Sequence, residues 1–320
     1  MGIRLLNTFL NAQNVNGIKK NEHFSMLKRK TICVDISIYL YKFKQEVADI
    51  INTSTGELLV DPHEVLLTRI EYMVNVLRRY QCELVVVFDG KPPKEKEETL
   101  EERRVNKKAA QSKNAVYKQM LIQRANQLSK EDKASLCNKI IAETKKSISI
   151  NKQDIEAVKE LFDELRVKYI ECEGEADDVC VELVKRGEAW GVMSDDTDFI
   201  AQCCKRVLRN VDFDNQRYDF INTQIVLYSL HMNQYDFKCI CVLGGCDYYK
   251  LETKSNKQIN IFKLYEYFCK YSAQIENNKN NKRNRNNQND QKEKDFLSWL
   301  AKYLEINVEE INHIIDTHMN

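Results

Sequence analysis

The sequence predicts an α/β fold built on a mainly parallel central sheet that is flanked by helices. Short apolar runs of the kind found in buried strands alternate with longer segments whose apolar residues recur every three to four positions. Strand–helix–strand alternation is typical of parallel sheets with helical crossovers. The 320 residues can form one large domain or two small ones, and we find no internal repeats.

Five apolar runs are expected to form the strands: Thr31 to Val34, Leu84 to Phe88, Val167 to Ile170, Ala189 to Met193 and Arg206 to Val211. Three segments have the period of a helix with one buried face: His63 to Tyr80, Lys152 to Leu165 and Glu175 to Arg186. Gly187 is expected to close the last of these, because glycine readily adopts the left-handed conformation found at many helix ends.

Residues 91 to 150 interrupt the alternation. They contain no glycine and few large apolar residues, and Lys91 to Lys118 carry nine basic and five acidic residues, a net charge of +4. High helix propensity predicts a charged helical insertion that stands off the core. The polar, low-complexity segment 276–294 is expected to be a disordered loop, followed by a helical piece that begins with Phe296 to Leu304.

Composition excludes several classes of protein. No apolar run approaches the roughly 18 residues of a membrane span, and the N-terminal apolar stretch is too short for a signal peptide. We therefore expect a soluble intracellular protein. The eleven cysteines form no CxxC pair and the five histidines are scattered, which argues against zinc and for small buried side chains in a reducing compartment. A phosphate-binding NTPase is excluded by the lack of a GxxxxGK[ST] loop.

Acidic residues follow four of the predicted strands, and one more follows an apolar helix. Because the carboxyl ends of parallel strands meet at one edge of a sheet, these side chains are expected to converge. Such a cluster repels itself unless a cation neutralises it, and an all-oxygen donor set suits Mg²⁺ or Mn²⁺. Two such ions about 3.5–4 Å apart would activate water against a phosphodiester. The acids in these positions are Asp35, Asp89, Glu171, Glu173, Glu175, Asp177, Asp178, Asp195, Asp196, Asp198 and Asp247.

Each acid alone also has a structural explanation. An aspartate after a strand commonly caps a helix or makes a turn, and Asp177 and Asp178 can complement a helix dipole. These explanations do not account for acids at four strand ends together, with a Glu-x-Glu and an Asp-x-Asp spacing among them. The pattern as a whole favours a metal site.

The chain resembles the flap endonuclease/XPG (Rad2-like) family of structure-specific 5′ nucleases over residues 1 to 250. The resemblance rests on MGI at the start and on VDISIYLYKF, VVVFDGKPPKEKEE, ECEGEADDVC, SDDTDF and LGGCDYY in the order of the family. It implies a PIN-like nuclease core, with an N-terminal nuclease region at 1–105, a helical arch at 91–150, an internal nuclease region at 151–250 and a helical C-terminal region at 251–320. The short chain and its Asn/Lys bias resemble a member from a large DNA virus.

The resemblance also implies roles for individual residues. One Mg²⁺ would be held by Asp89, Glu173 and Glu175, with Asp35 reaching it through water. A second would lie nearer Asp196, Asp198 and Asp247, and Mn²⁺ would substitute for either.

Basic and aromatic residues would act on the nucleic acid. Lys96 and Arg103 would hold the scissile phosphate from one helix face, although each can equally belong to a solvated face. Tyr41 would stack on a base, worth about 1–3 kcal/mol. Tyr39, Tyr41 and Phe43 alternate, however, so one or two of them must belong to the core. The main chain at Gly2 would lie close to the site, and Arg104, Lys107 and Lys108 would contact phosphates.

Two features depart from the family. The segment after Asp247-Tyr248-Tyr249 reads KLETKSNKQINIFKLYEYF, without the glycine of the family's duplex-binding hairpin. The family's way of binding duplex DNA, and its monovalent-ion site, are therefore not implied for this chain. The C-terminus also lacks a sliding-clamp box.

The expected function is a Mg²⁺-dependent endonuclease, monomeric and without a membrane partner, that cuts branched or 5′-flapped DNA in replication, repair or recombination. It would work in the nucleus (the host nucleus if viral) or at a cytoplasmic replication site. The alternatives are a 5′ exonuclease, a PIN-like ribonuclease, or a branched-DNA-binding module without catalysis.

Overall fold

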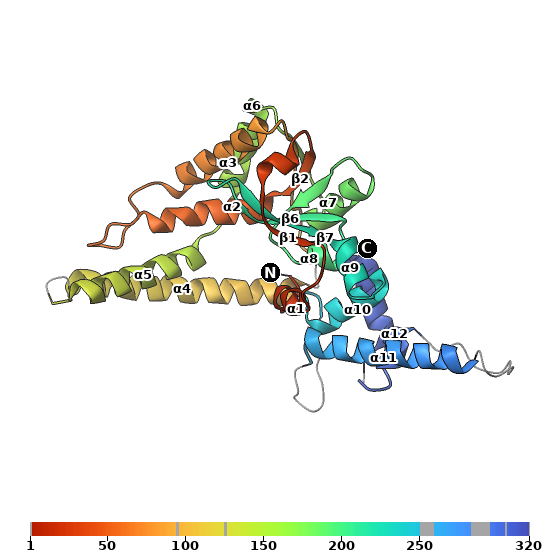
Figure 1. Ribbon diagram of the computed structural model, residues 1–320. Helices are drawn as coiled ribbons and strands as arrows, with labels where there is room; N and C mark the ends of the chain where they lie inside the picture. The colour runs from red at the N-terminus through yellow and green to blue at the C-terminus, as the bar shows by residue number, and fades with distance from the viewer. Residues whose placement is uncertain are drawn as a thin grey trace. The chain divides into compact units, whose positions relative to one another are not determined.

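The chain forms a seven-stranded sheet with helices around it, as a computed structural model shows (Figure 1). The structure describes residues 2–93, 96–124, 127–249, 259–282, 295–304 and 306–319. The strand order is β1-β7-β6-β5-β2-β3-β4. In chain order the strands are β1 (Ile18–His23), β2 (Thr31–Asp35), β3 (Glu83–Phe88), β4 (Lys168–Glu171), β5 (Gly191–Met193), β6 (Arg206–Asp212) and β7 (Arg217–Asn222). The α/β class expected from the sequence is confirmed.

The four strands β5-β2-β3-β4 are parallel, and their register aligns their carboxyl ends. Asp35 pairs with Val87, Phe88 with Glu171, and Val34 with Met193. All five expected strands are present, with ends shifted by one or two residues. No apolar pattern predicts β1, whose residues IKKNEH are mostly exposed and polar because β1 lies at the edge of the sheet. Strand β7 was not expected either.

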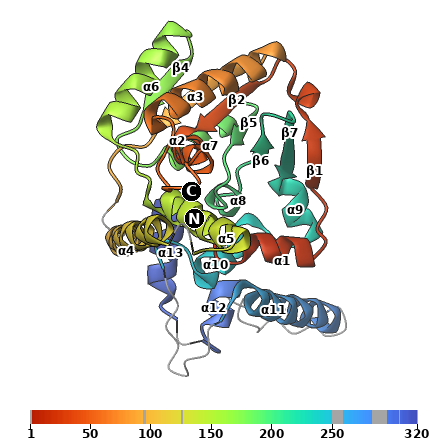
Figure 2. The same cartoon turned by 90° about the vertical axis from the view of Figure 1, so that its left-hand side faces the viewer.

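Helices cover both faces of these parallel strands. They are α2 (Ile36–Gln45), α3 (Pro62–Arg79), α6 (Lys152–Glu164) and α7 (Ala176–Lys185). The crossovers from β2 to β3 and from β3 to β4 run in one direction along the sheet, and the crossover from β4 to β5 runs back. Right-handed crossovers of opposite direction place their helices on opposite faces. Accordingly α2, α3 and α6 share one face, with α3 and α6 side by side (Figure 2), and α7 covers the other.

The chain divides into two compact units. The strand-rich unit consists of Glu22–Ser194 and Asn210–Tyr218, and the helix-rich unit of Met1–Asn21, Asp195–Arg209 and Asp219–Asn320. The remaining elements are α1 (Leu6–Ala12), η1 (Phe24–Leu27), η2 (Glu46–Asp49), α4 (Glu97–Gln123), α5 (Lys130–Ser147), α8 (Asp198–Ala201), α9 (Thr223–Ser229), α10 (Gln234–Gly244), α11 (Ile261–Lys282), α12 (Phe296–Leu300) and α13 (Val308–His318).

The charged insertion forms a pair of helices, α4 and α5, that lie side by side (Figures 1 and 2). Only Ala110 and Leu121 of α4 are buried. A small apolar cluster joins Leu121 to Ile140 and Cys137 of α5 and to Ile51 after η2. The pair is therefore helical, as expected, and packs on the segment that follows α2.

In the helix-rich unit, α11 extends into the segment that the sequence predicts to be a disordered loop. Residues 276–282 were expected to begin a disordered loop, but they extend α11 to Lys282. Asparagine is a weak helix former, yet lengthening an existing helix avoids the cost of nucleating one. Residues 283–294 of the expected loop lie outside the described residues. Of the helices that are described, none is long and apolar enough to cross a membrane.

The cysteines behave as the sequence predicts. All eleven are free thiols, and eight are buried: Cys33, Cys82, Cys137, Cys180, Cys204, Cys239, Cys241 and Cys246. Burial raises the pKa of several of these thiols above the ordinary value, as it does for Cys246, whose pKa is raised to about 12. The thiols with a raised pKa remain protonated at pH 7, and the buried cysteines pack as small apolar side chains.

Candidate metal and nucleic-acid site

Asp35 is the last residue of β2 and caps the N-terminus of α2, where it is 4% exposed. The hydroxyl of Ser194 donates a hydrogen bond of 2.8 Å to its Oδ2. Ser194 directly follows β5 and is fully buried, so this bond joins two neighbouring strand ends. Ser194 was not among the residues expected at the site, although it is the first residue of the SDDTDF motif.

The acids after β3 and β4 are brought together by their main chains. Asp89 Oδ1 accepts the N–H of Ala176 at 2.8 Å, and the N–H of Gly90 bonds to the carbonyl of Gly174 at 2.7 Å. A Cβ at Gly90 would lie 2.1 Å from the Cys172 carbonyl oxygen, so only glycine permits this approach. Asp89 therefore lies beside the segment that carries Glu173 and Glu175.

Lys96 joins this group through an ion pair. Its Nζ lies 2.5 Å from Glu175 Oε1, and the two side chains are only 12% and 19% exposed. The N–H of Lys96 bonds to the Pro93 carbonyl in a turn, and α4 begins at Glu97. Lys96 thus caps α4, which corrects the expectation that Lys96 and Arg103 both lie within one helix. Arg103 lies more than one turn after the start of α4, and its side chain is exposed.

In the helix-rich unit, the N-terminal segment lies against the loop that carries Asp196. Gly2 has a φ of +85°, and a Cβ there would lie 2.3 Å from Asp196 Oδ1. The N–H of Ile3 donates to Thr197 Oγ1 at 2.7 Å, and the N–H of Asp198 donates to Asp196 Oδ1 at 3.1 Å. The main chain at Gly2 therefore lies close to Asp196, one of the candidate acids.

The same N-terminal segment contacts the turn before Asp247. The N–H of Arg4 bonds to the Gly245 carbonyl at 2.9 Å, and Gly245 has a φ of +106°. Asp247 follows two residues later, just after α10. Residues 2–4 thus bond to both chain segments that carry the acids of this unit. Arg209, which no sequence pattern marked, is 8% exposed and donates to the Asp195 carbonyl at 2.6 Å.

The seven acids fall into two groups, one in each unit. Asp35, Asp89, Glu173 and Glu175 belong to the strand-rich unit, and Asp196, Asp198 and Asp247 to the helix-rich unit. This division coincides with the two sets of ligands implied by the family resemblance. Among the described residues, no three His, Cys, Asp or Glu side chains stand close enough together to hold an ion.

The chemistry of the donors nevertheless fits a hard divalent cation. Every candidate ligand is a carboxylate. The main chain at Gly2 lies close to the Asp196 carboxylate, and the main chain at Gly90 lies close to the main chain of Glu173. Burial raises the pKa of the neighbouring Cys172 thiol to about 11, and the Asp89 carboxylate contributes to the increase. In the metal-free protein Cys172 is therefore a neutral thiol at pH 7 and adds no negative charge to the carboxylates of this group.

The candidate nucleic-acid residues are exposed. Tyr41 of α2 is 43% exposed, whereas Tyr39 and Phe43 are buried. One or two of these three were expected to belong to the core, and on a helix residues 39 and 43 share the face opposite residue 41. Arg104 and Lys108 lie on the exposed surface of α4 and Lys107 is partly exposed.

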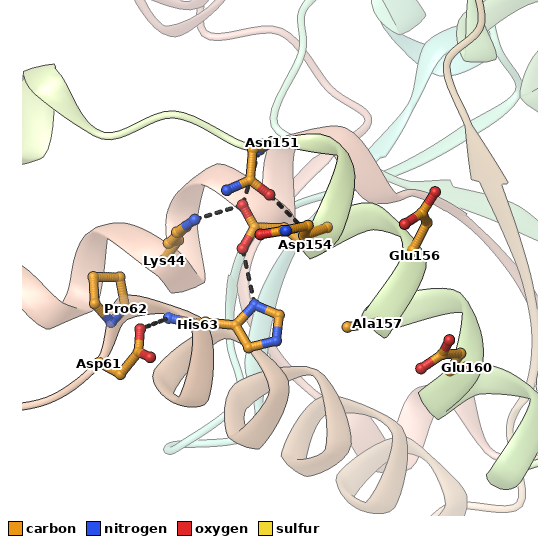
Figure 3. A pocket seen from close by; sticks show the side chains of 10 residues that line it. Lys44, Asp61, Pro62, His63, Asn151, Asp154, Glu156, Ala157 and Glu160 are labelled. Atoms are coloured by element: carbon orange, nitrogen blue, oxygen red, sulfur yellow. Dashed lines mark hydrogen bonds and ion pairs between the residues drawn. The ribbon is translucent and has the colours of Figure 1, made fainter.

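A cavity of about 590 Å³ lies elsewhere in the strand-rich unit, between the end of α2 and the beginnings of α3 and α6 (Figure 3). Asp154, 1% exposed, accepts hydrogen bonds from Lys44 at 2.5 Å and from His63 at 3.0 Å. Lys44 is nine residues beyond Asp35 on α2, about 14 Å along the helix. The cavity therefore belongs to the packing of three helices and not to the edge that carries the acids.

Comparison with known proteins identifies two family domains. An XPG N-terminal domain matches residues 1–111, and an XPG I-region matches residues 166–247. The N-terminal match ends within α4, and α5 lies outside both matches. Together the two matches include all seven candidate acids.

Curated relatives carry the name flap endonuclease 1. The proteins of Candida glabrata and Leishmania braziliensis are 26% and 28% identical to this chain, each over 78% of it. The protein of Glycine max is 28% identical, also over 78% of this chain. The chain spans 61%, 60% and 62% of the lengths of these three relatives.

Solved structures share the fold. The catalytic core of Rad2 in complex with a DNA substrate has a TM-score of 0.61 at 18% identity, covering 100% of this chain and 88% of that one. The flap endonuclease-1 of Methanococcus jannaschii has a TM-score of 0.56 at 19% identity, covering 98% and 97%. With the two matching domains and the shared nuclease fold, the chain belongs to the XPG family.

Proposed function

We propose that the protein is a Mg²⁺-dependent, structure-specific DNA endonuclease that cuts 5′-flapped or otherwise branched DNA. The observation that carries the proposal is the pair of carboxylate groups, each held by close main-chain packing at a glycine, Gly90 in one unit and Gly2 in the other. The names of the curated relatives agree with this activity. We assign this cleavage activity to DNA replication, repair or recombination, and we propose that the protein acts as a monomer.

The acids are the proposed metal ligands. Asp89, Glu173 and Glu175, with Asp35 behind them, would hold one ion, and Asp196, Asp198 and Asp247 the other. When bound, two such ions supply Lewis-acid activation of water and stabilise the leaving oxygen. Ser194 orients the Asp35 carboxylate through its hydrogen bond, and Ala176 orients Asp89 in the same way.

The remaining residues would position the DNA. Lys96 and Arg103 would hold the scissile phosphate and offset its developing negative charge. The exposed ring of Tyr41 would stack on a terminal base, and Arg104, Lys107 and Lys108 would contact phosphates of the single strand. Gly2 would let the backbone approach the reacting strand, since any side chain there meets Asp196.

The test is cleavage of an end-labelled 5′-flap duplex in Mg²⁺ beside single-stranded, nicked and junction DNA and a matched RNA. We expect cutting near the flap base, and we expect Asp196→Asn to lower its rate by about 100-fold or more while DNA binding persists, because the variant lacks a metal ligand. Asp163→Asn, on the exposed surface of α6, is the matched control and should cut normally.

Other outcomes would assign a different function. RNA cut as fast as the DNA flap would make the protein a ribonuclease, and cleavage only from free 5′ ends would make it an exonuclease. Full activity of Asp196→Asn would contradict the assignment of the acids. DNA binding without cleavage of any substrate would indicate a binding module.

A further inference from the structure

The ion pair between Lys96 and Glu175 carries an inference beyond phosphate binding. Lys96 is one of two residues proposed to hold the substrate phosphate, and Glu175 is one of the proposed metal ligands. The structure joins these two functions directly, since Lys96 Nζ lies 2.5 Å from Glu175 Oε1. The carboxylate that would bind a metal ion is thus bonded to the ammonium that would bind the phosphate.

The pair is built into the fold. Lys96 ends the loop after β3, and Glu175 caps α7. The main chains of these two segments are bonded to one another, at 2.7 Å from Gly90 N to Gly174 O and at 3.0 Å from Lys91 N to Glu173 O. The two side chains therefore meet where these two segments are already joined, and both are more than four-fifths buried.

We propose that the Lys96 ammonium and a divalent cation compete for the Glu175 carboxylate, so that binding of the cation releases Lys96 to the substrate phosphate. This inference rests on the proposed function. A charge-assisted hydrogen bond in a partly dry site is among the stronger polar contacts, so a cation that takes Glu175 must overcome it. Once displaced from Glu175, the Lys96 ammonium can turn to the phosphate of the reacting strand.

Competition also predicts how metal and DNA affect one another. Without DNA, the Lys96 ammonium opposes binding of the cation; once released, it favours binding of the phosphate. The cation and the DNA therefore each strengthen binding of the other, and by the same factor. Lys96 would therefore be a phosphate-binding residue whose availability depends on whether the metal site is filled. Binding of the phosphate to a protein that holds no cation is disfavoured, because Glu175 is then still paired with Lys96.

Calorimetric titration of Mn²⁺ into the full chain without DNA tests the competition. We expect Lys96→Met to bind Mn²⁺ about tenfold more tightly than the wild type, the equivalent of about 1.4 kcal/mol. Lys96→Arg keeps the positive charge and should bind no more tightly than the wild type. Lys91→Met removes an exposed charge from the same loop and should change the affinity less than about twofold, because exposed charges are screened.

A second measurement follows Lys96 itself. We expect the ¹⁵N ammonium signal of Lys96 to be visible in the wild-type protein without metal and to broaden as Mg²⁺ is added, since a released ammonium exchanges with water. Equal Mn²⁺ affinity of Lys96→Met and the wild type, or an equal gain from Lys91→Met, would overturn the competition. A wild-type protein that binds no divalent ion would instead overturn the proposed function.

Discussion

At the scale of single residues, the site depends on glycines that permit close packing and on hydrogen bonds that orient the acids. Gly90 allows the segments after β3 and β4 to touch, and Gly2 allows the N-terminal segment to lie against Asp196. Ser194 and Ala176 each donate a hydrogen bond to one carboxylate. Packing this close leaves no space for a larger side chain.

Gly2→Ala is therefore expected to reduce cleavage of a flap substrate by about 10- to 100-fold, because the new Cβ would displace the Asp196 carboxylate. The backbone cost of a positive φ is separate, about 1–2 kcal/mol. Gly187→Ala controls for it, since Gly187 has a φ of +76° and open space around its Cβ. Single-turnover cleavage with parallel thermal melts should show a lower melting temperature in both variants, with the larger shift in Gly2→Ala, but slow cleavage only in Gly2→Ala.

At the scale of elements, three helices of the strand-rich unit are joined by one buried carboxylate. Asp154 at the start of α6 accepts hydrogen bonds from Lys44 of α2, from His63 of α3 and from the main chain of Asn151 (Figure 3). Burial raises the pKa of Asp154, but these three donors outweigh burial and lower it below the ordinary value. The group fixes α2, whose first residue follows Asp35.

Lys44→Met is expected to lower the free energy of unfolding by about 3–5 kcal/mol, because it leaves a buried carboxylate without its cation. The double variant Lys44→Met/Asp154→Asn should recover part of this stability, since the buried charge is then gone as well. Lys152→Met, at a pair whose lysine side chain is 90% exposed, should cost no more than about 1 kcal/mol. Denaturant unfolding of the four proteins measures this, and a double variant less stable than Lys44→Met would contradict it.

The same carboxylate predicts a dependence on pH. An acid whose pKa is lower in the folded than in the unfolded state stabilises the fold above its unfolded value of 3.8, and this stability is lost as pH falls through the lower folded pKa. The Asp154→Asn variant has no carboxylate at this position and therefore has no such pH-dependent contribution to lose. We expect the stability of the wild type to fall more steeply than that of Asp154→Asn below pH 3.8, measured by unfolding at pH 2 to 7; parallel curves would exclude the contribution.

At the scale of the whole molecule, the net charge is close to zero although basic and acidic residues are concentrated in different places. The net charge is +1, yet residues 91–118 carry +4 and the candidate site consists of acids. A protein with metal-binding acids and a basic helix can hold cations and phosphates at different places without being a polycation. Its affinity for DNA should therefore come from α4 and not from the surface in general.

Neutralising Arg104, Lys107 and Lys108 to glutamine is expected to weaken binding of single-stranded DNA and to reduce the slope of log affinity against log salt by up to about 2, roughly 0.7 for each phosphate that is no longer neutralised. The matched control replaces Lys28, Lys152 and Lys168, three exposed lysines outside α4 and α5. The slopes of the two triple variants can be compared by fluorescence anisotropy of labelled single-stranded DNA at salt concentrations from about 50 to 300 mM. Equal slopes would place the DNA elsewhere.

The α/β class, the five strands β2 to β6 and the positions of the acids at the strand ends could all be predicted from the sequence alone, because periodicity and strand ends are local properties of the chain. The family resemblance added the division of those acids into two sets. Edge strand β1 and the last seven residues of α11 could not be predicted, since neither is marked by a local apolar pattern.

Which groups touch, by contrast, depends on the tertiary structure. The partner of Lys96, the bond from Ser194 to Asp35 and the contact of Gly2 with Asp196 join residues that lie 79, 159 and 194 positions apart in the chain. Such pairs follow from how strands and loops pack in three dimensions, and spacing along one sequence cannot specify them. The same packing made Tyr41, and not Tyr39 or Phe43, the exposed ring of α2.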